Sequence, residues 1–158
     1  MSIINVRPAA AGDTQAIAAV VKESWLHSNR DLLPEDSAKS LMHCERLAEV
    51  VTMNWRSVWV AEYQGRVVGT VGVNELGHFW MLYVMPSYQG LGVGTALYDA
   101  AIASLRKRGA AKAMLEVLAA NENAVAFYRA RGWVPEGRRT EHIPGFRFTA
   151  LRMGLALA

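Results

Sequence analysis

The chain has 158 residues, of which 52% are hydrophobic and 20% are charged, and its formal net charge is +3 at pH 7. These values favour a single folded domain over residues 1–158 and exclude a disordered chain, while the short apolar runs exclude a transmembrane helix. The first residues lack the pattern of a signal peptide, and Cys44, the one cysteine, excludes an internal disulfide. We therefore expect a cytoplasmic protein with no membrane partner and no metal, because His43 and Cys44 form only a fragment of a metal site.

Hydrophobic periodicity and turn residues predict the order of strands and helices. In the first half we expect a strand at residues 3–7, a helix with Asp13 as its N-cap, a loop at 27–34, a second helix from Pro34 to about residue 53, and strands at 57–63, 66–74 and 78–85, the first two joined by a hairpin turn at Gln64 and Gly65. In the second half we expect a helix ending near Lys107 with Gly109 as its stop, a strand at 112–118, a helix capped by Asn121, and strands at 137–141 and 146–153.

The most informative segment is the glycine-rich stretch QGLGVG at residues 89–94, which joins an apolar strand to a helix. Unpaired N–H groups at such a helix N-terminus, together with the helix dipole, favour a phosphate or pyrophosphate. The dinucleotide fingerprint does not fit, because Thr95 stands where its third glycine belongs, and no Gly-Lys-Ser/Thr follows to make a P-loop. Nucleic acid is not an expected partner, because no basic stripe is interleaved with aromatic residues.

Two motifs resemble those of the GNAT superfamily of N-acetyltransferases. Gln89-x-x-Gly92-x-Gly94, after Leu-Tyr-Val-x-Pro, resembles the acetyl-coenzyme A (acetyl-CoA) signature of that family, and Asn-x-x-Ala-x-x-Phe-Tyr-x-x-x-Gly-Trp at residues 121–133 resembles its next motif. The element order also matches the GNAT fold across nearly the whole chain. The resemblance implies an α+β (mixed α/β) fold: a mostly antiparallel twisted sheet, splayed between its fourth and fifth strands and flanked by about four helices.

The resemblance further implies transfer of the acetyl group of acetyl-CoA to a primary amine of a small molecule, by direct attack in a ternary complex. A primary amine is protonated at neutral pH, and freeing it costs on the order of 4–5 kcal/mol, so the site needs a route for that proton. Two alternatives remain open at this point: acetylation of a macromolecular amine, such as a protein N-terminus or an aminoacyl-tRNA, and a non-catalytic acyl-CoA sensor.

Family members bind the cofactor with the edge of the fourth strand and the glycine-rich loop. By resemblance, the backbone of Tyr83, Val84 and Met85 pairs with the pantetheine arm, and the Val84 N–H faces the thioester carbonyl. Asn121 either contacts that arm or caps its helix, with Asn123 as the alternative cap. The expected cofactor-binding residues are Leu82, Tyr83, Val84, Met85, Gln89, Gly90, Leu91, Gly92, Val93, Gly94, Thr95 (also through its hydroxyl), Asn121, Asn123, Phe127 and Tyr128.

Tyr128 matches the family tyrosine beside the thioester sulfur, so we expect it to be the general acid for the departing thiolate. For the general base, Glu116 resembles the glutamate proposed in ribosomal-protein N-terminal acetyltransferases. Met81 is apolar where related sequences often have a polar residue, so ordered water is one alternative route for the proton. The other candidates are Glu75, His78, Glu141 and His142.

The acceptor should be bound by the first two helices, their loop and the final hairpin. The candidate substrate-binding residues are Trp25, His27, Trp80 and His142, with Asn29 and Phe146 as further lining residues. An amino acid, a polyamine, an antibiotic or a peptide N-terminus all remain open as acceptors. A homodimer is possible, because the apolar last residues suit pairing through a terminal strand.

Overall fold

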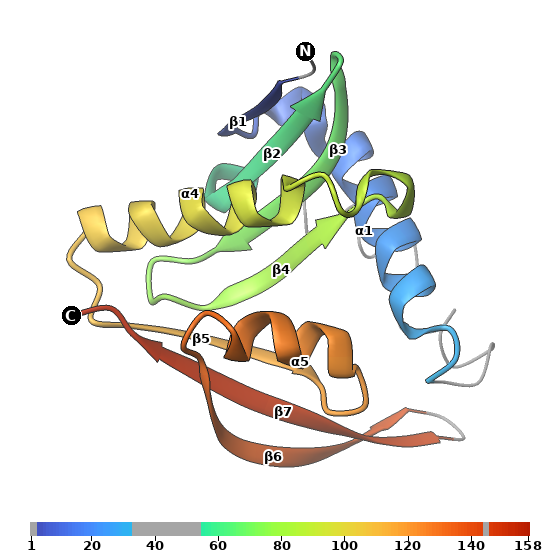
Figure 1. The fold of residues 1–158 in the computed structure, drawn as a ribbon, viewed down its shortest axis with the longest axis vertical. Coiled ribbons are helices and arrows are strands. Elements are labelled where there is room, and N and C mark those ends of the chain that lie inside the picture. The colour runs from blue at the N-terminus through green and yellow to red at the C-terminus, as the bar shows by residue number, and fades with distance from the viewer. Residues whose placement is uncertain (1–2, 33–54, 144–145) are drawn as a thin grey trace.

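The computed structural model describes residues 3–32, 55–143 and 146–158 (Figure 1). The strands are β1 (Ile4–Pro8), β2 (Val58–Tyr63), β3 (Arg66–Val73), β4 (Phe79–Val84), β5 (Lys112–Leu118), β6 (Val134–Ile143) and β7 (Phe146–Ala156). The helices are α1 (Thr14–Asn29), α4 (Val93–Lys107) and α5 (Glu122–Arg129). The second helix predicted for residues 34–53, with His43 and Cys44, lies outside the described residues. Of the helices described, none is long and apolar enough to cross a membrane.

The strands form two antiparallel sheets, ordered β1-β2-β3-β4 and β5-β7-β6. The sheets meet at one end, where His78 and Met114 form a parallel bridge and the Met114 N–H donates to the Gly77 carbonyl at 2.9 Å. Gly77 makes this approach possible, because its φ is +89° and a Cβ there would lie 2.2 Å from the Lys112 carbonyl oxygen. Beyond the bridge β4 and β5 diverge, so the expected mixed fold, splayed between the fourth and fifth strands, is confirmed.

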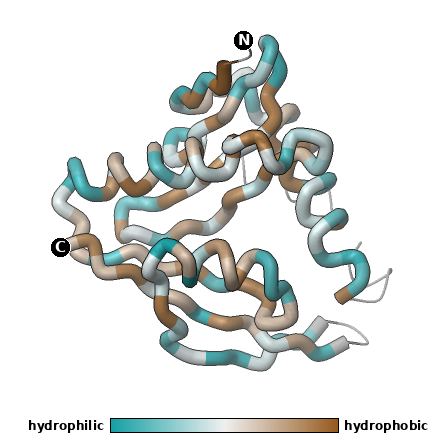
Figure 2. Tube along the Cα trace, viewed as in Figure 1, coloured by the Kyte–Doolittle hydropathy of each residue, from teal (hydrophilic) through white to brown (hydrophobic). Residues whose placement is uncertain are grey.

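Helices α1 and α4 cover opposite faces of the four-stranded sheet (Figure 1). Strand alternation explains this arrangement: Val58 and Val60 join the apolar cluster under α1, whereas Ala61 joins the larger cluster under α4. Leu97 and Leu105 of α4 are fully buried in that larger cluster. Figure 2 shows hydrophobic positions running along the strands of both sheets, while hydrophilic positions gather at loops and helix ends. Burial of these apolar faces is the main stabilising term for both layers.

Most local predictions hold, and the differences have simple causes. Gln64 and Gly65 both have positive φ, as a tight hairpin turn requires. Asp13 is the N-cap residue of α1, as predicted, but its side chain makes no capping bond. Its carboxylate instead pairs with Arg7 (2.7 Å) and accepts the Ala10 N–H (2.7 Å), and these bonds hold its pKa below the usual range. The last two strands are longer than predicted, because β6 stays paired with β7 through the irregularity near Pro135 and β7 continues beside β5 as far as Ala156.

Candidate active site

Two cavities open on either side of the splay between the sheets. The loop-side cavity, about 540 Å³, reaches Gln89 and Gly94 at the glycine-rich loop. The sheet-side cavity, about 420 Å³, reaches Trp80, Glu116 and Glu141 on the other side. Both cavities share one wall, made by Ser28, Leu82, Tyr83, Asn121, Ala124 and Tyr128. A ligand in one cavity can therefore meet a ligand in the other at this shared wall.

The free edge of β4 forms part of the shared wall. The Met85 N–H donates to the Val68 carbonyl of β3 (2.8 Å), and antiparallel alternation then turns the peptide groups of Val84 and Leu82 away from β3, into the gap. The Val84 carbonyl accepts hydrogen bonds from Ser24 Oγ (2.8 Å) and Gln89 Nε2 (3.2 Å), which fix the end of the strand. The one irregularity in the β3–β4 register leaves Trp80 as the extra residue, so the strand bulge lies in the sheet-side cavity.

The glycine-rich loop presents backbone N–H groups to the loop-side cavity. Gly92 is the N-cap of α4, with a φ of +88°, and no side chain caps the helix. The Ala96 N–H donates to the Gly92 carbonyl (3.0 Å) as the first bond of the helix, so the N–H groups of Val93, Gly94 and Thr95 precede the intrahelical ladder. Their orientation and the dipole of a 15-residue helix favour an anion at this point.

Arg131 places a positive charge beside the same turn. Its Nη2 donates to Thr95 Oγ1 (3.1 Å) and its Nη1 to the Phe127 carbonyl (2.9 Å), and its guanidinium lies 3.5 Å from the centre of the Phe127 ring. Arg131 was not among the site residues predicted from the sequence, and its contact with Thr95 was missed. No short-range pattern could have revealed it, because Thr95 is 36 residues away.

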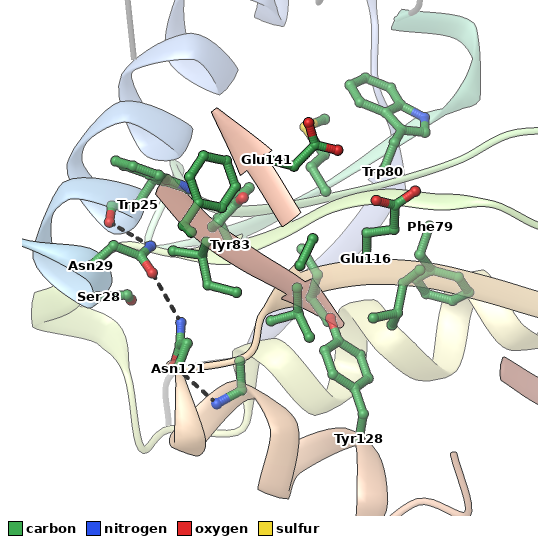
Figure 3. Close-up of a pocket in the computed structure, with 18 of the residues that line it drawn as sticks. Trp25, Ser28, Asn29, Phe79, Trp80, Tyr83, Glu116, Asn121, Tyr128 and Glu141 are labelled. Atoms are coloured by element: carbon green, nitrogen blue, oxygen red, sulfur yellow. Dashed lines mark hydrogen bonds between the residues drawn. The ribbon is translucent and has the colours of Figure 1, made fainter. Parts of the chain in front are cut away.

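Tyr128 of α5 forms the floor of both cavities, and Figure 3 shows its hydroxyl directed from the helix into the sheet-side cavity. Its ring packs edge-on against Phe127 and Trp133. Burial, with smaller contributions from Tyr83 and Tyr98, raises the pKa of Tyr128 above its usual value, and burial raises the pKa of Tyr83 to about 12. Both hydroxyls therefore stay protonated at neutral pH and are available as donors.

Asn121 connects two helices across the splay. Its Oδ1 accepts the Ala124 N–H (3.2 Å) as the N-cap of α5, and its Nδ2 donates to Asn29 Oδ1 (3.4 Å), as Figure 3 shows. Asn29 is buried at the end of α1 and donates to the Trp25 carbonyl (2.9 Å). The predicted cap is confirmed, whereas Asn123 is exposed on α5.

A charged cluster lines the sheet-side cavity. Arg139 of β6 donates to Glu116 of β5 (2.8 Å) and also forms an ion pair with Glu141 of its own strand. Figure 3 shows the Glu116 and Glu141 carboxylates directed into the same part of the cavity, near Trp80. Arg139 was not among the site residues predicted from the sequence, and its place between two carboxylates was missed.

The other predicted site residues fall on different sides of the splay. Trp25 lines the sheet-side cavity, and His27 lines the loop-side cavity from an exposed position. His142 is exposed on β6 and lines neither of these cavities, and the Phe146 side chain lies outside the described part of the chain. Within the glycine-rich stretch, the Leu91 side chain is 49% exposed, whereas Val93 is buried in the core and offers a ligand only its backbone.

Two antiparallel sheets that separate between β4 and β5, with a glycine-rich turn beside the opening, define an acyltransferase of the GNAT type. A sequence profile of the acetyltransferase (GNAT) family matches residues 22–133, and the chain belongs to this family. Among the described residues, no group of three or more His, Cys, Asp and Glu side chains lies close enough together to hold a metal ion.

Known relatives cover most of the chain, and solved structures of the same fold cover nearly all of it. An uncharacterized N-acetyltransferase of Mycobacterium bovis is 32% identical over 136 residues, which cover 81% of this chain and 87% of the relative. A GCN5-related N-acetyltransferase from Rhodopseudomonas palustris has a crystal structure that superimposes with a TM-score of 0.82 at 28% identity, covering 99% of this chain and 97% of that one. The fold is also shared by the PaiA N-acetyltransferase of Thermoplasma acidophilum in complex with coenzyme A (TM-score 0.70, 19% identity, covering 98% and 99% of the two chains).

Proposed function

We propose that this N-acetyltransferase takes its acetyl group from acetyl-CoA and transfers it to the primary amine of a small molecule in a ternary complex. One observation carries the proposal: the outward edge of β4 at Leu82 and Val84 lies between two cavities that meet at Tyr128. A thioester in one cavity and an amine in the other would then react at that edge without an acyl-enzyme. When bound, acetyl-CoA supplies an acetyl group that is already activated as a thioester.

The loop-side cavity fits coenzyme A. The N–H groups of residues 93–95 and the nearby Arg131 suit its pyrophosphate, and a Cβ on Gly90 or Gly92 would meet no atom within 4 Å, so the loop surface is open to a ligand. The outward peptide groups of β4 suit the amides of the pantetheine arm. The protein of the same fold from Thermoplasma acidophilum, solved with coenzyme A, supports this assignment.

Three groups of the chain would carry the chemistry. The Val84 N–H donates to the thioester carbonyl oxygen and stabilises the charge that develops there. Glu116, through water, takes a proton from the acceptor ammonium and passes it to solvent, so that the neutral amine forms a C–N bond while the C–S bond breaks. Tyr128 donates its hydroxyl proton to the departing sulfur, and the second proton of the attacking nitrogen leaves through water as the amide forms and restores the tyrosine hydroxyl. Each of the three roles has a polar group at or near the shared wall.

The test is thiol release from acetyl-CoA in the presence of a panel of primary amines, with coenzyme A binding measured separately by calorimetry. We expect micromolar to millimolar KM values for acetyl-CoA, which is the common range for enzymes. Acetyl-CoA binding with no thiol release from any amine would refute the proposed reaction and leave a binding protein.

A further inference from the structure

The sheet-side cavity has a charge that selects among amines. Its described lining carries two carboxylates, Glu116 and Glu141, and one guanidinium, Arg139, so one negative charge is left over. The acids come from neighbouring parts of β5 and β6, whose central partner is β7, and both reach the same guanidinium. A cavity of this sign, with walls of low polarity, attracts cations and repels anions.

The arginine is already engaged on two sides. Its Nη2 bonds to Glu116 at 2.8 Å and its Nε faces Glu141. Within the described lining it is the one cation of the cavity, so an acceptor carboxylate finds no free positive partner there. Recognition of an amino acid through its carboxylate would require breaking both ion pairs. The side chain is 65% exposed, however, so it can swing into water at little cost when another cation replaces it.

The aromatic lining adds a second preference of the same kind. Trp25 and Trp80 line the cavity from α1 and β4, together with Tyr83 of β4 and Phe148 of β7. Indole faces attract ammonium groups and cover the methylene chains that carry them. A cavity of about 420 Å³ has room for a small, extended amine.

From this arrangement we infer that the acceptor is a small diamine-type cation: one amine reacts at the shared wall, and a second ammonium is held at Glu141 in the place of the Arg139 guanidinium. Glu141 is then a residue that determines specificity, and Arg139 is an internal cation that the acceptor displaces. The inference rests on the proposed function, because it takes the sheet-side cavity as the acceptor site.

Three acceptors of equal carbon chain length isolate the charge of the far group. Butane-1,4-diamine, n-butylamine and 4-aminobutanoate carry an ammonium, a methyl group and a carboxylate there. With saturating acetyl-CoA at neutral pH, we expect kcat/KM for the diamine to exceed that for butylamine by at least about 10-fold, beyond the twofold advantage of two equivalent amines, and 4-aminobutanoate to be the poorest. Equal values for the three acceptors, or a preference for 4-aminobutanoate, would overturn the inference and leave the proposed function standing.

Two variants should move the diamine-to-butylamine ratio of kcat/KM in opposite directions. Glu141→Gln removes the partner of the second ammonium and should lower this ratio about 3- to 10-fold. Arg139→Gln removes the competing cation and should raise it. If Glu141 and Arg139 only supported the structure, the two substitutions would not change this ratio in opposite directions. Glu23→Gln, an exposed change on α1 outside both cavities, should leave the ratio unchanged.

A binding measurement separates this inference from the proposed reaction. Calorimetric titration of butane-1,4-diamine into the protein with coenzyme A present needs no turnover. If Glu141→Gln weakens diamine binding, the inference is supported, even if no amine releases thiol. Absence of thiol release would refute only the proposed reaction. If the diamine binds no better than butylamine, or if the substitution leaves its binding unchanged, the inference is overturned.

Discussion

The cavities on the two sides of the splay differ in the kind of group that would bind the ligand, backbone on one side and side chains on the other. The groups of the loop-side cavity proposed to hold the donor are backbone N–H groups from one contiguous segment, residues 89–95, and the edge of β4, while α1 and α5 complete the lining. The sheet-side cavity depends on side chains from α1, β4, β5 and β6, which lie far apart in the chain. A backbone site tolerates many side chains but needs glycines at fixed positions, whereas a side-chain site changes with each substitution. One fold can therefore keep one donor and vary its acceptors.

Gly92→Glu should abolish ligand binding at the loop-side cavity and leave the sheet-side cavity intact. A side chain at a φ of +88° is strained, and a carboxylate at the first turn of α4 opposes an anionic ligand, so we expect coenzyme A affinity to fall more than about 100-fold. Gly109→Glu is a matched control, because Gly109 has a φ of +77°, has equally open surroundings and lies at the other end of α4. Calorimetric binding of coenzyme A should be lost in the first variant and retained in the second. Similar losses in both would point to a general effect of strain.

The same contrast explains how much of the molecule the sequence could predict. The glycine-rich loop, the hairpin at Gln64 and Gly65, and the Asn121 cap depend on residues a few positions apart, so local patterns identify them. The fold followed from those motifs and the order of elements. The contacts that the sequence did not predict join segments that are distant in the chain: the hydrogen bond between Asn29 and Asn121 spans 92 residues, and the ion pair between Glu116 and Arg139 spans 23. Periodicity carries no information about which charged side chains meet across a cavity.

Asp13 shows a smaller limit of the same kind. It is the N-cap residue of α1, as its position before the helix predicts, and the chain enters α1 through a short 3₁₀ turn at Ala11–Asp13. Its side chain makes no capping bond, because its carboxylate pairs with Arg7 of β1 and accepts the Ala10 N–H. The local sequence therefore predicts where the helix begins but not which partner the carboxylate takes.

The shared wall is tested by Tyr128→Phe, which removes the hydroxyl of a residue that lines both cavities. If Tyr128 donates a proton to the departing sulfur, kcat should fall about 10- to 1,000-fold while coenzyme A affinity changes little. The measurement is steady-state thiol release together with calorimetric binding. Tyr63→Phe, a half-buried change outside both cavities, is the matched control. Unchanged kcat in Tyr128→Phe would remove the tyrosine from the reaction.

Asn121 makes two hydrogen bonds that can be tested separately: it caps α5, and it bonds to Asn29 of α1. Asn121→Ala removes both the cap and the bond to Asn29, so the free energy of unfolding should fall by about 1–2 kcal/mol. Asn121→Ser keeps a capping oxygen but no longer reaches Asn29, so it should recover most of the lost stability. Urea denaturation measures both changes. If the serine variant is as unstable as the alanine variant, the bridge to Asn29 and not the cap is the main contribution.

The smallest expected effect is a loss of stability at alkaline pH, caused by ionisation of Tyr83 in the shared wall. Burial raises the pKa of Tyr83 to about 12, so the folded protein keeps this proton at a pH where the unfolded chain begins to lose it. Above the unfolded value near 10 the unfolded state binds fewer protons than the native state, and the free energy of unfolding must fall as pH rises. At pH 10 the loss amounts to about 0.4 kcal/mol for such a tyrosine. Urea denaturation at pH 8 and pH 10 should show a drop that is smaller by this amount in Tyr83→Phe than in the unmodified protein. An equal drop in both would mean that the Tyr83 hydroxyl is solvated, and that the wall between the two cavities is more open to water than its burial implies.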